Sequence, residues 1–331
     1  MPTYYINEFV VNSDFALPAD ASARPTPERA DIPGVTLRRA SLANVPSLLR
    51  KLRRQLVYDV GDGFLLEPHT DLALHLDRKG TTITVDCSDE RLLPVAAWAF
   101  HAGLGFATIR RGGFPLHGAG LEIAGRFVAL VGNSGQGKST LAGFLAERGA
   151  RFGSDDLVAV YPGENGVCAF PAVSLYPKLS REAVDRQGLD PTSLLVADYG
   201  LGEEEYYLPL PQRRRVVNPA PLAAIFLLAP LTAPACVCGG CGSCQCARAD
   251  ENRPEGVEVR HVPASEAVHH LAGLGHAWEL VGKWLDTNKR RDVCAQIAAQ
   301  VPVYELRYVR TFDVLPAVEA AICSALETTA L

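Results

Sequence analysis

Hydrophobic and polar residues alternate along the first part of the chain. Apolar residues occupy every second position at 72–76, a turn sequence follows at 78–80, and apolar residues return at 83 and 85. This period is typical of antiparallel strands with one buried face. Residues 4–11 predict one further strand, and Gly61 and Gly63 predict another hairpin. We therefore expect a β-rich N-terminal domain over residues 1–88, where a substrate could dock.

From about residue 89 the pattern changes to strands that alternate with helices. Continuous apolar runs predict buried strands at residues 127–131, 157–160, 222–229 and 303–308. Helical patterns occur at residues 92–109, 140–148 with Gly149 as its C-cap, 265–285 with Ser265 as its cap, and after Asp313 with Pro316 in the first turn. This alternation predicts a second domain over 89–331, a mixed sheet flanked by helices.

Charge and composition narrow the classes of partner. The formal net charge is −5 and the isoelectric point is about 5.9, which does not favour a nucleic-acid partner. The apolar run at 92–109 contains Pro94, His101 and two glycines, so it predicts a buried helix rather than a membrane span. The first residues lack a basic region and an apolar core, so we expect no signal peptide and a cytoplasmic protein.

A phosphate-binding pattern, G-x-x-x-x-G-K-S, lies between the predicted strand at 127–131 and the helix that follows it. The candidate nucleotide-binding residues are Gly132, Asn133, Ser134, Gly135, Gln136, Gly137, Lys138, Ser139 and Thr140. Backbone N–H groups of such a loop surround phosphate oxygens, Lys138 would neutralise the β- and γ-phosphates, and Ser139 would bind Mg²⁺. We expect ATP and Mg²⁺ as cofactors; the alternative is a glycine-rich loop that binds nothing.

Two adjacent carboxylates, Asp155 and Asp156, follow the lysine at short distance. Only seventeen residues separate Lys138 from Asp155, room for one short helix and one turn. Beside a triphosphate, one carboxylate can hold Mg²⁺ and the other can accept the proton of an attacking hydroxyl. We assign Asp156 as a metal ligand and both residues as catalytic, although the sequence does not show which one is the base. The alternative is a solvated turn or a helix cap.

These motifs resemble the catalytic domain of HPr kinase/phosphorylase over about residues 95–180. The resemblance rests on the loop, on the Arg148-Gly149 and Asp155-Asp156 steps, and on His117-Gly118 before the loop strand. It is strongest to the HPr-kinase-related proteins of lasso-peptide biosynthetic clusters, some of which phosphorylate a serine of the precursor peptide. It implies an α/β fold, a P-loop kinase domain of the HPr kinase and phosphoenolpyruvate carboxykinase type. It also places His117 near the phosphates; alternatively, His117 caps a strand end.

The acidic run at 203–205 departs from the pattern of related proteins, because no Lys or Arg follows its carboxylates. Glu204 or Glu205 could act as a second metal ligand for Mg²⁺. A solvated surface run is the alternative. The glutamate-containing signature of true HPr kinase is also absent, which leaves phosphorolysis and phosphatase activity open.

Five thiols cluster within eleven residues of a glycine-rich segment: Cys236, Cys238, Cys241, Cys244 and Cys246. Their spacing suits a tetrahedral Zn²⁺ site with four cysteine ligands. The alternatives are an iron–sulfur cluster and an insertion whose cysteines have no specific role.

Two classes of function follow. The first is a serine kinase, whose acceptor is a precursor peptide or protein, or a free small molecule such as serine. The second is a nucleotide-dependent peptide-binding module without phosphoryl transfer. Three basic runs, at 51–54, 213–215 and 289–291, are candidates for peptide docking, with Arg290 or Arg291 near the γ-phosphate. An oligomer is compatible with the sequence.

Overall fold

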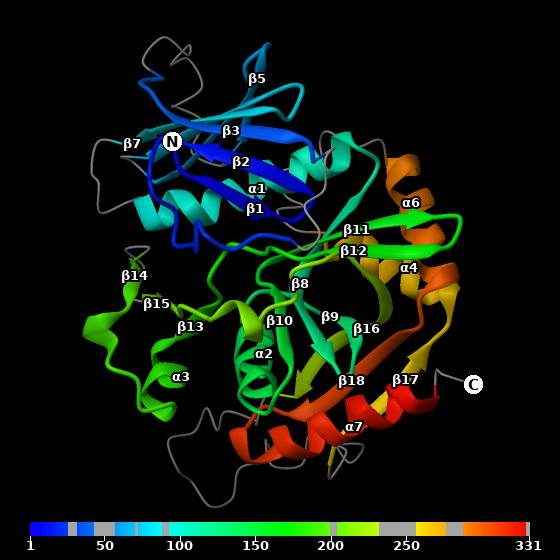
Figure 1. Cartoon of the computed structure of the whole chain (residues 1–331). Helices are drawn as coiled ribbons and strands as arrows, with labels where there is room; N and C mark the ends of the chain where they lie inside the picture. The colour runs from blue at the N-terminus through cyan, green and yellow to red at the C-terminus, as the bar shows by residue number, and fades with distance from the viewer. Residues whose placement is uncertain are drawn as a thin grey trace, which may run out of the picture.

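The computed structural model describes residues 1–25, 32–42, 57–69, 72–87, 93–198, 204–231, 256–275 and 287–328. Within these residues the protein is mixed α/β and contains three sheets (Figure 1). The cysteine cluster, the basic run at 51–54 and the predicted helix beyond residue 275 lie outside the described residues. None of the described helices has the length and apolar character needed to cross a membrane.

Seven strands form the N-terminal sheet, in the order β1-β2-β3-β7-β6-β5-β4. They are β1 (Thr3–Ile6), β2 (Phe9–Ser13), β3 (Gly34–Arg39), β4 (Val57–Asp59), β5 (Gly63–His69), β6 (Leu72–Asp77) and β7 (Thr82–Cys87). The hairpins at Gly61 and at 78–80 are confirmed. The single strand predicted over 4–11 is wrong: it is a hairpin, because Asn7 takes a left-handed φ of 54° and turns the chain.

Helix α1 (Leu93–Arg110) lies between the N-terminal sheet and the rest of the molecule (Figure 1). Leu74 and Val85 of the sheet share one core with Phe106 of α1 and with Leu157 and Ala159 of strand β11 (Leu157–Gly163). Because this core is continuous, removal of the N-terminal residues would expose buried surface of the second part of the chain.

The eight-stranded central sheet has the path β10-β8-β11-β12-β16-β18-β17, with β9 paired to both β8 and β16. Its strands are β8 (Phe114–Ile123), β9 (Arg126–Val131), β10 (Arg151–Ser154), β11 (Leu157–Gly163), β12 (Gly166–Phe170), β16 (Ala220–Leu231), β17 (Glu258–Val262) and β18 (Val303–Val309). Strands β9, β16 and β18 run parallel to each other. Their carboxyl ends therefore meet at one edge, where α/β proteins commonly bind ligands.

Strand β9 shows how the two faces of this sheet are covered. Phe127, Ala129 and Val131 belong to the core that includes α4 (Ala264–Gly273) and α6 (Thr287–Gln300). Val128 and Leu130 alternate with them and pack in the core of α2 (Lys138–Glu147) and α7 (Leu315–Thr328). The uninterrupted apolar run at 127–131 is thus a strand buried on both faces.

The third sheet is small and has the order β13-β15-β14, formed by β13 (Lys178–Ser180), β14 (Leu195–Asp198) and β15 (Glu204–Tyr207). Helix α3 (Arg181–Arg186) follows β13 directly, and Leu179, Ala183, Val184 and Tyr206 form its core. Figure 1 shows this sheet and α3 beside α2.

Helix boundaries differ from the predictions in four places. Helix α2 begins at Lys138, and Gly149, with a φ of 106°, lies just beyond its end as predicted. Helix α4 begins after Pro263, so Ser265 lies inside its first turn and does not cap it, and the helix ends at Gly273 instead of continuing toward residue 285. Asp313 belongs to a short 3₁₀ turn (Phe312–Val314) that precedes α7, whereas Pro316 occupies the first turn as expected.

Candidate functional site

The glycine-rich loop joins β9 to α2 at the edge where the parallel strands end. Gly135 and Gly137 adopt left-handed φ values of 78° and 86°, which other residues adopt only with strain. Two hydrogen bonds within the loop hold its conformation. The Asn133 N–H donates to Gln136 Oε1, and Lys138 Nζ donates to the Asn133 carbonyl at 2.9 Å. Burial lowers the pKa of the Lys138 ammonium from its ordinary value, against the attraction of Asp156 and Asp155.

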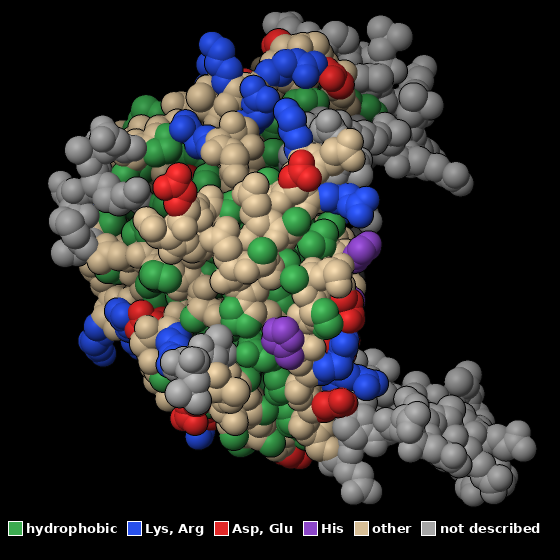
Figure 2. Space-filling model, turned by 90° about the vertical axis from the view of Figure 1, so that its right-hand side faces the viewer, with side chains coloured by type: hydrophobic (Ala, Val, Ile, Leu, Met, Phe, Trp, Pro, Cys, Tyr) green, Lys and Arg blue, Asp and Glu red, His purple; other side chains and the backbone are tan. Residues whose placement is uncertain are grey.

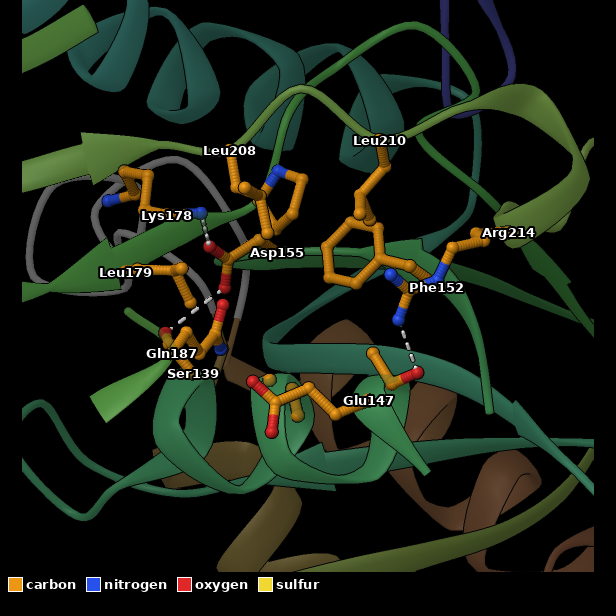
Figure 3. A pocket seen from close by; sticks show the side chains of 14 residues that line it. Ser139, Glu147, Phe152, Asp155, Lys178, Leu179, Gln187, Leu208, Leu210 and Arg214 are labelled. Carbon is orange, nitrogen blue, oxygen red and sulfur yellow. Dashed lines mark hydrogen bonds between the residues drawn. The ribbon is translucent and has the colours of Figure 1, made fainter. Parts of the chain in front are cut away.

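Asp155 lies in the turn between β10 and β11, directly beside the first turn of α2. Its Oδ1 accepts hydrogen bonds from Ser139 Oγ at 3.2 Å and from the Asp156 N–H at 3.1 Å, and its Oδ2 accepts one from the Lys178 N–H at 2.9 Å. Figure 3 shows Ser139, Asp155 and Lys178 converging at this point. The pKa of Asp155 is raised to about 6, mainly because the carboxyl group is buried and secondly because Asp156 is negatively charged. A cation at this position would relieve that cost.

Asp156 points to a different set of partners. Its backbone has a left-handed φ of 62°, and its Oδ2 lies 2.5 Å from Lys178 Nζ and 3.8 Å from His101 Nδ1. Lys178 Nζ also donates to Glu205 Oε2 at 2.8 Å. The side chain of Lys178 is only 4% exposed, whereas Glu205 is 34% exposed. The two carboxylates therefore share one buried ammonium, and solvent reaches them from the Glu205 side.

The sequence reasoning missed Lys178 and His101. A lone lysine between Tyr176-Pro177 and Leu179, in an otherwise apolar stretch, was the available signal for the first. A histidine inside the apolar run at 92–109 was the signal for the second. A charged or polar residue within a buried element is uncommon unless it has a partner.

Of the two glutamates proposed from the acidic run, only Glu205 joins the site. Glu204 is exposed and accepts a hydrogen bond from the Tyr206 hydroxyl. The cation that the sequence lacked after these carboxylates comes from β13, the neighbouring strand, in the form of Lys178. The ammonium lies between Glu205 and Asp156, so a metal-ligand role for Glu205 stays a prediction.

His117 lies where β8 changes partners from β11 to β9. Its carbonyl accepts a hydrogen bond from the N–H of Gly132, the first residue of the loop, at 3.4 Å. The pKa of His117 is lowered to about 4, mainly because the imidazole is buried and secondly because Lys138 is positively charged. The imidazole is therefore neutral at physiological pH. Gly118 must be a glycine here, because a Cβ atom would lie 2.5 Å from the Leu130 carbonyl oxygen.

The oxygen donors of the site decide which metal ion it could bind. No cluster of three or more His, Cys, Asp or Glu residues suited to a metal occurs in the described part of the chain. Mg²⁺ does not require one, since it keeps several waters and binds one or two protein groups together with substrate phosphates. The hydroxyl of Ser139 and the carboxylate of Asp155 fit that pattern, whereas the Zn²⁺ prediction concerns cysteines outside the described residues.

Lys178 is held in place by the preceding segment 172–177, which we call the strap. The Ser174 N–H donates to the Tyr5 carbonyl, and the Tyr5 N–H donates to Ser174 Oγ, both at 2.8 Å. Arg215, 2% exposed, donates from Nη1 to the carbonyls of Val173, Ser174 and Leu175. The N-terminal sheet and a buried arginine therefore brace the strap that leads into Lys178.

Two of the three predicted basic runs lie within the described residues, in different environments. In the run 213–215, Arg215 is buried under the strap, and Arg214 donates to the Ala146 carbonyl at the end of α2, as Figure 3 shows. In the run 289–291, all three residues belong to α6, which covers the opposite face of the sheet from α2. Their predicted roles, in docking or near the γ-phosphate, stay predictions.

Comparison with known proteins gives little further information. No protein family matches the chain, and no curated protein matches its sequence. Among solved structures, the HPr(Ser) kinase/phosphatase from Coxiella burnetii is similar, with a TM-score of 0.32 and 12% identity over 66% of this chain and 99% of that one. These values are too low to assign the chain to that family.

Proposed function

We propose that this protein is an ATP- and Mg²⁺-dependent kinase that transfers the γ-phosphoryl group to a serine hydroxyl. The observation that carries the proposal is the contact between Ser139 Oγ and Asp155 Oδ1 at the start of α2, with a second carboxylate, Asp156, at the next position. It brings together a phosphate-binding loop, oxygen ligands for a metal and a separate proton acceptor. A module that only binds nucleotide does not need a proton acceptor.

Ser139 and Asp155 are the proposed ligands of Mg²⁺. The sequence assigned Asp156 to this role, but Asp155 is the carboxylate that lies against Ser139, and its raised pKa reflects a buried charge that a cation would stabilise. When bound, Mg²⁺ would offset negative charge on the phosphates. Lys138 and the loop N–H groups would also stabilise the negative charge on the phosphates.

Asp156 is the proposed proton acceptor. As the serine oxygen forms its bond to the γ-phosphorus, the bond from that phosphorus to the β–γ bridging oxygen breaks and ADP leaves. The hydroxyl proton passes to the Asp156 carboxylate. Lys178 orients this carboxylate through the 2.5 Å contact to Oδ2, and the strap fixes Lys178 in turn. Neutral His117 borders the site without adding a further charge.

The proposed acceptor is a serine within a peptide, with a ribosomal precursor peptide of the lasso type as the specific proposal, or within a protein. The enclosed space among His101, Asp155 and Lys178 measures about 10 Å³, about enough for one water and too small for an amino acid. An acceptor would therefore approach from the more exposed Glu205 side and remain partly outside the protein, as a peptide does.

The N-terminal sheet offers a surface for such a peptide. Figure 2 shows Lys and Arg side chains gathered at the end of the molecule where this sheet lies. The exposed cations of the sheet include Arg38 and Arg39 on β3 and Lys79 in the β6–β7 turn. These charges favour a peptide with acidic residues near its serine.

The test is incubation with γ-labelled ATP and a panel of acceptors: serine peptides with and without acidic residues, the same peptides with alanine in place of serine, and free serine. We expect label in the serine peptides and none in the alanine peptides. Preferred labelling of free serine would replace the peptide acceptor with a small molecule. ATP binding without labelling of any acceptor, and without ADP formation, would favour the binding module.

A further inference from the structure

A large cavity opens on the side of the glycine-rich loop that faces away from Asp155. Its volume is about 490 Å³, within the usual range for small-molecule sites. Three elements form its walls: the first turn of α2, helix α3, and the segment from the end of β18 to the start of α7. Nothing in the proposed phosphoryl transfer uses this space.

The loop residues that line the cavity define its relation to a bound triphosphate. Gly137 and Thr140 face the cavity, whereas Ser139 contacts Asp155 and the Lys138 ammonium contacts the Asn133 carbonyl. In loops of this kind the lysine and the metal act at the β- and γ-phosphates. The α-phosphate of a bound triphosphate would therefore lie toward Thr140, and whatever is attached to it would leave the loop on the cavity side.

A cation–π pair lies on the cavity wall. The Arg186 guanidinium lies over the Phe312 ring, 3.6 Å from its centroid. Arg186 is exposed and belongs to α3, while Phe312 is partly buried and belongs to the turn after β18. A guanidinium plane and an aromatic ring are the two surfaces on which nucleic-acid bases stack, independently of the base sequence.

Polar groups also line the cavity. Arg310 and Tyr308 line the cavity close to Gly137: a Cβ atom on Gly137 would lie 4.0 Å from Arg310 Nε and 3.9 Å from the Tyr308 hydroxyl. Arg310 is placed to contact an α-phosphate oxygen. The carboxylates of Glu182 and Asp313 also line the cavity and can accept hydrogen bonds from ribose hydroxyls.

We propose that this cavity holds the nucleoside of the phosphoryl donor, with its base stacked on the Arg186–Phe312 pair. The inference rests on the proposed function, since it takes the glycine-rich loop as the triphosphate site. It makes the donor a nucleoside triphosphate rather than an inorganic polyphosphate, and it gives α3, an element outside the central sheet, a part in donor recognition.

The experiment compares two ligands in the presence of Mg²⁺: the ATP analogue AMP-PNP, and tripolyphosphate, which has the same phosphate chain without a nucleoside. Binding is measured by calorimetry for the wild type, Arg186→Ala, Phe312→Leu and a control, Arg181→Ala. Arg181 is on the same helix, is similarly exposed and, like Arg186 with Glu182, forms an ion pair within the helix, with Asp185, but it does not line the cavity.

We expect the wild type to bind AMP-PNP at least about 10-fold more tightly than tripolyphosphate, the scale of one stacked base. Arg186→Ala and Phe312→Leu should each weaken AMP-PNP binding by about 5-fold or more and leave tripolyphosphate binding unchanged, and Arg181→Ala should change neither. Equal wild-type affinities for the two ligands, or AMP-PNP binding that is insensitive to both substitutions, would overturn the inference.

The outcome also separates this inference from the proposed function. If tripolyphosphate binds and Lys138→Ala abolishes its binding, the loop is a phosphate site whatever the cavity does. If neither ligand binds the wild type, both the kinase proposal and the nucleoside cavity are wrong.

Discussion

Ser139 and Asp155 are sixteen residues apart in the chain, yet the hydroxyl of one donates to the carboxylate of the other at 3.2 Å. The next residue, Asp156, turns away and meets Lys178 instead, because its left-handed backbone points its side chain elsewhere. Two adjacent carboxylates thereby enter two different environments, and this difference allows their roles to be tested separately.

Asp155→Asn and Asp156→Asn should differ in how they depend on Mg²⁺. If Asp155 binds the metal with Ser139, its replacement should raise the Mg²⁺ concentration needed for half-maximal activity by about 10-fold or more. Asp156→Asn should lower kcat by about 10²-fold or more, the usual scale for a lost proton acceptor, with the Mg²⁺ requirement unchanged. Kinetics at varied Mg²⁺ measure both. The reverse pattern would return Asp156 to the metal, as the sequence first suggested.

Lys178→Met should destabilise the protein as well as inactivate it. The substitution leaves Asp156 and Glu205 without their shared ammonium in a mostly buried place, which should lower the free energy of unfolding by about 2 kcal/mol or more. Denaturant unfolding measures this. The double variant Lys178→Met/Glu205→Gln should recover part of the loss, because one of the two unpaired charges is then removed. No recovery would mean that Lys178 does not stabilise these carboxylates.

Glu8 should make stability depend on pH. Its carboxylate is buried and accepts hydrogen bonds from the hydroxyls of Thr108 and Tyr161, and burial raises its pKa above the ordinary 4.5. The folded protein therefore holds this proton more tightly than the unfolded chain does. This contribution to stability is fully present below pH 4.5 and is lost as the pH rises through the raised pKa.

Glu8→Gln removes this titration and keeps an acceptor for both hydroxyls. We expect the variant to gain stability relative to the wild type as the pH is raised from about 5 to 8, measured by denaturant unfolding at each pH. A difference between the two proteins that stays constant over this range would show that Glu8 keeps an ordinary pKa in the folded state.

Gly118→Ala should disturb the loop strand. The added methyl group would lie 2.5 Å from the Leu130 carbonyl oxygen, and a backbone atom cannot move aside cheaply. We expect a loss of about 2 kcal/mol of unfolding free energy, within the range for overpacked cores. Gly34→Ala in β3 is the matched control, since it has no atom within 4 Å of the added methyl and should be nearly neutral. Thermal unfolding compares the two, and equal midpoints would contradict the predicted clash.

The strand–loop–helix unit could be predicted from sequence because its signals are local. An apolar run, glycines at left-handed positions and the lysine-serine pair all lie within a few residues of each other. Asp155 and Asp156 could be named for the same reason. The different environments of these two residues could not be predicted, because they depend on contacts with Ser139 and Lys178 that only the folded chain creates.

The prediction was weakest where long-range packing decides the role of a residue. The run 213–215 appears in sequence as a surface of three arginines, yet Arg215 is buried because the strap offers its guanidinium several carbonyl acceptors. Lys178 was overlooked because its partners, Asp156 and Glu205, lie 22 and 27 residues away and on other elements. Spacing along one chain segment cannot reveal such a cluster.

The central claim is that ATP donates a phosphoryl group to serine with Asp156 as proton acceptor. Its most direct measurement is intact mass spectrometry of a serine peptide after incubation with ATP, Mg²⁺ and either the wild type or Asp156→Asn, beside the same peptide with alanine at the acceptor position. We predict that the wild type adds one phosphoryl group to the serine peptide only, and that the variant adds it at least about 10²-fold more slowly. Equal rates for the wild type and the folded variant, or phosphorylation of the alanine peptide, would contradict it.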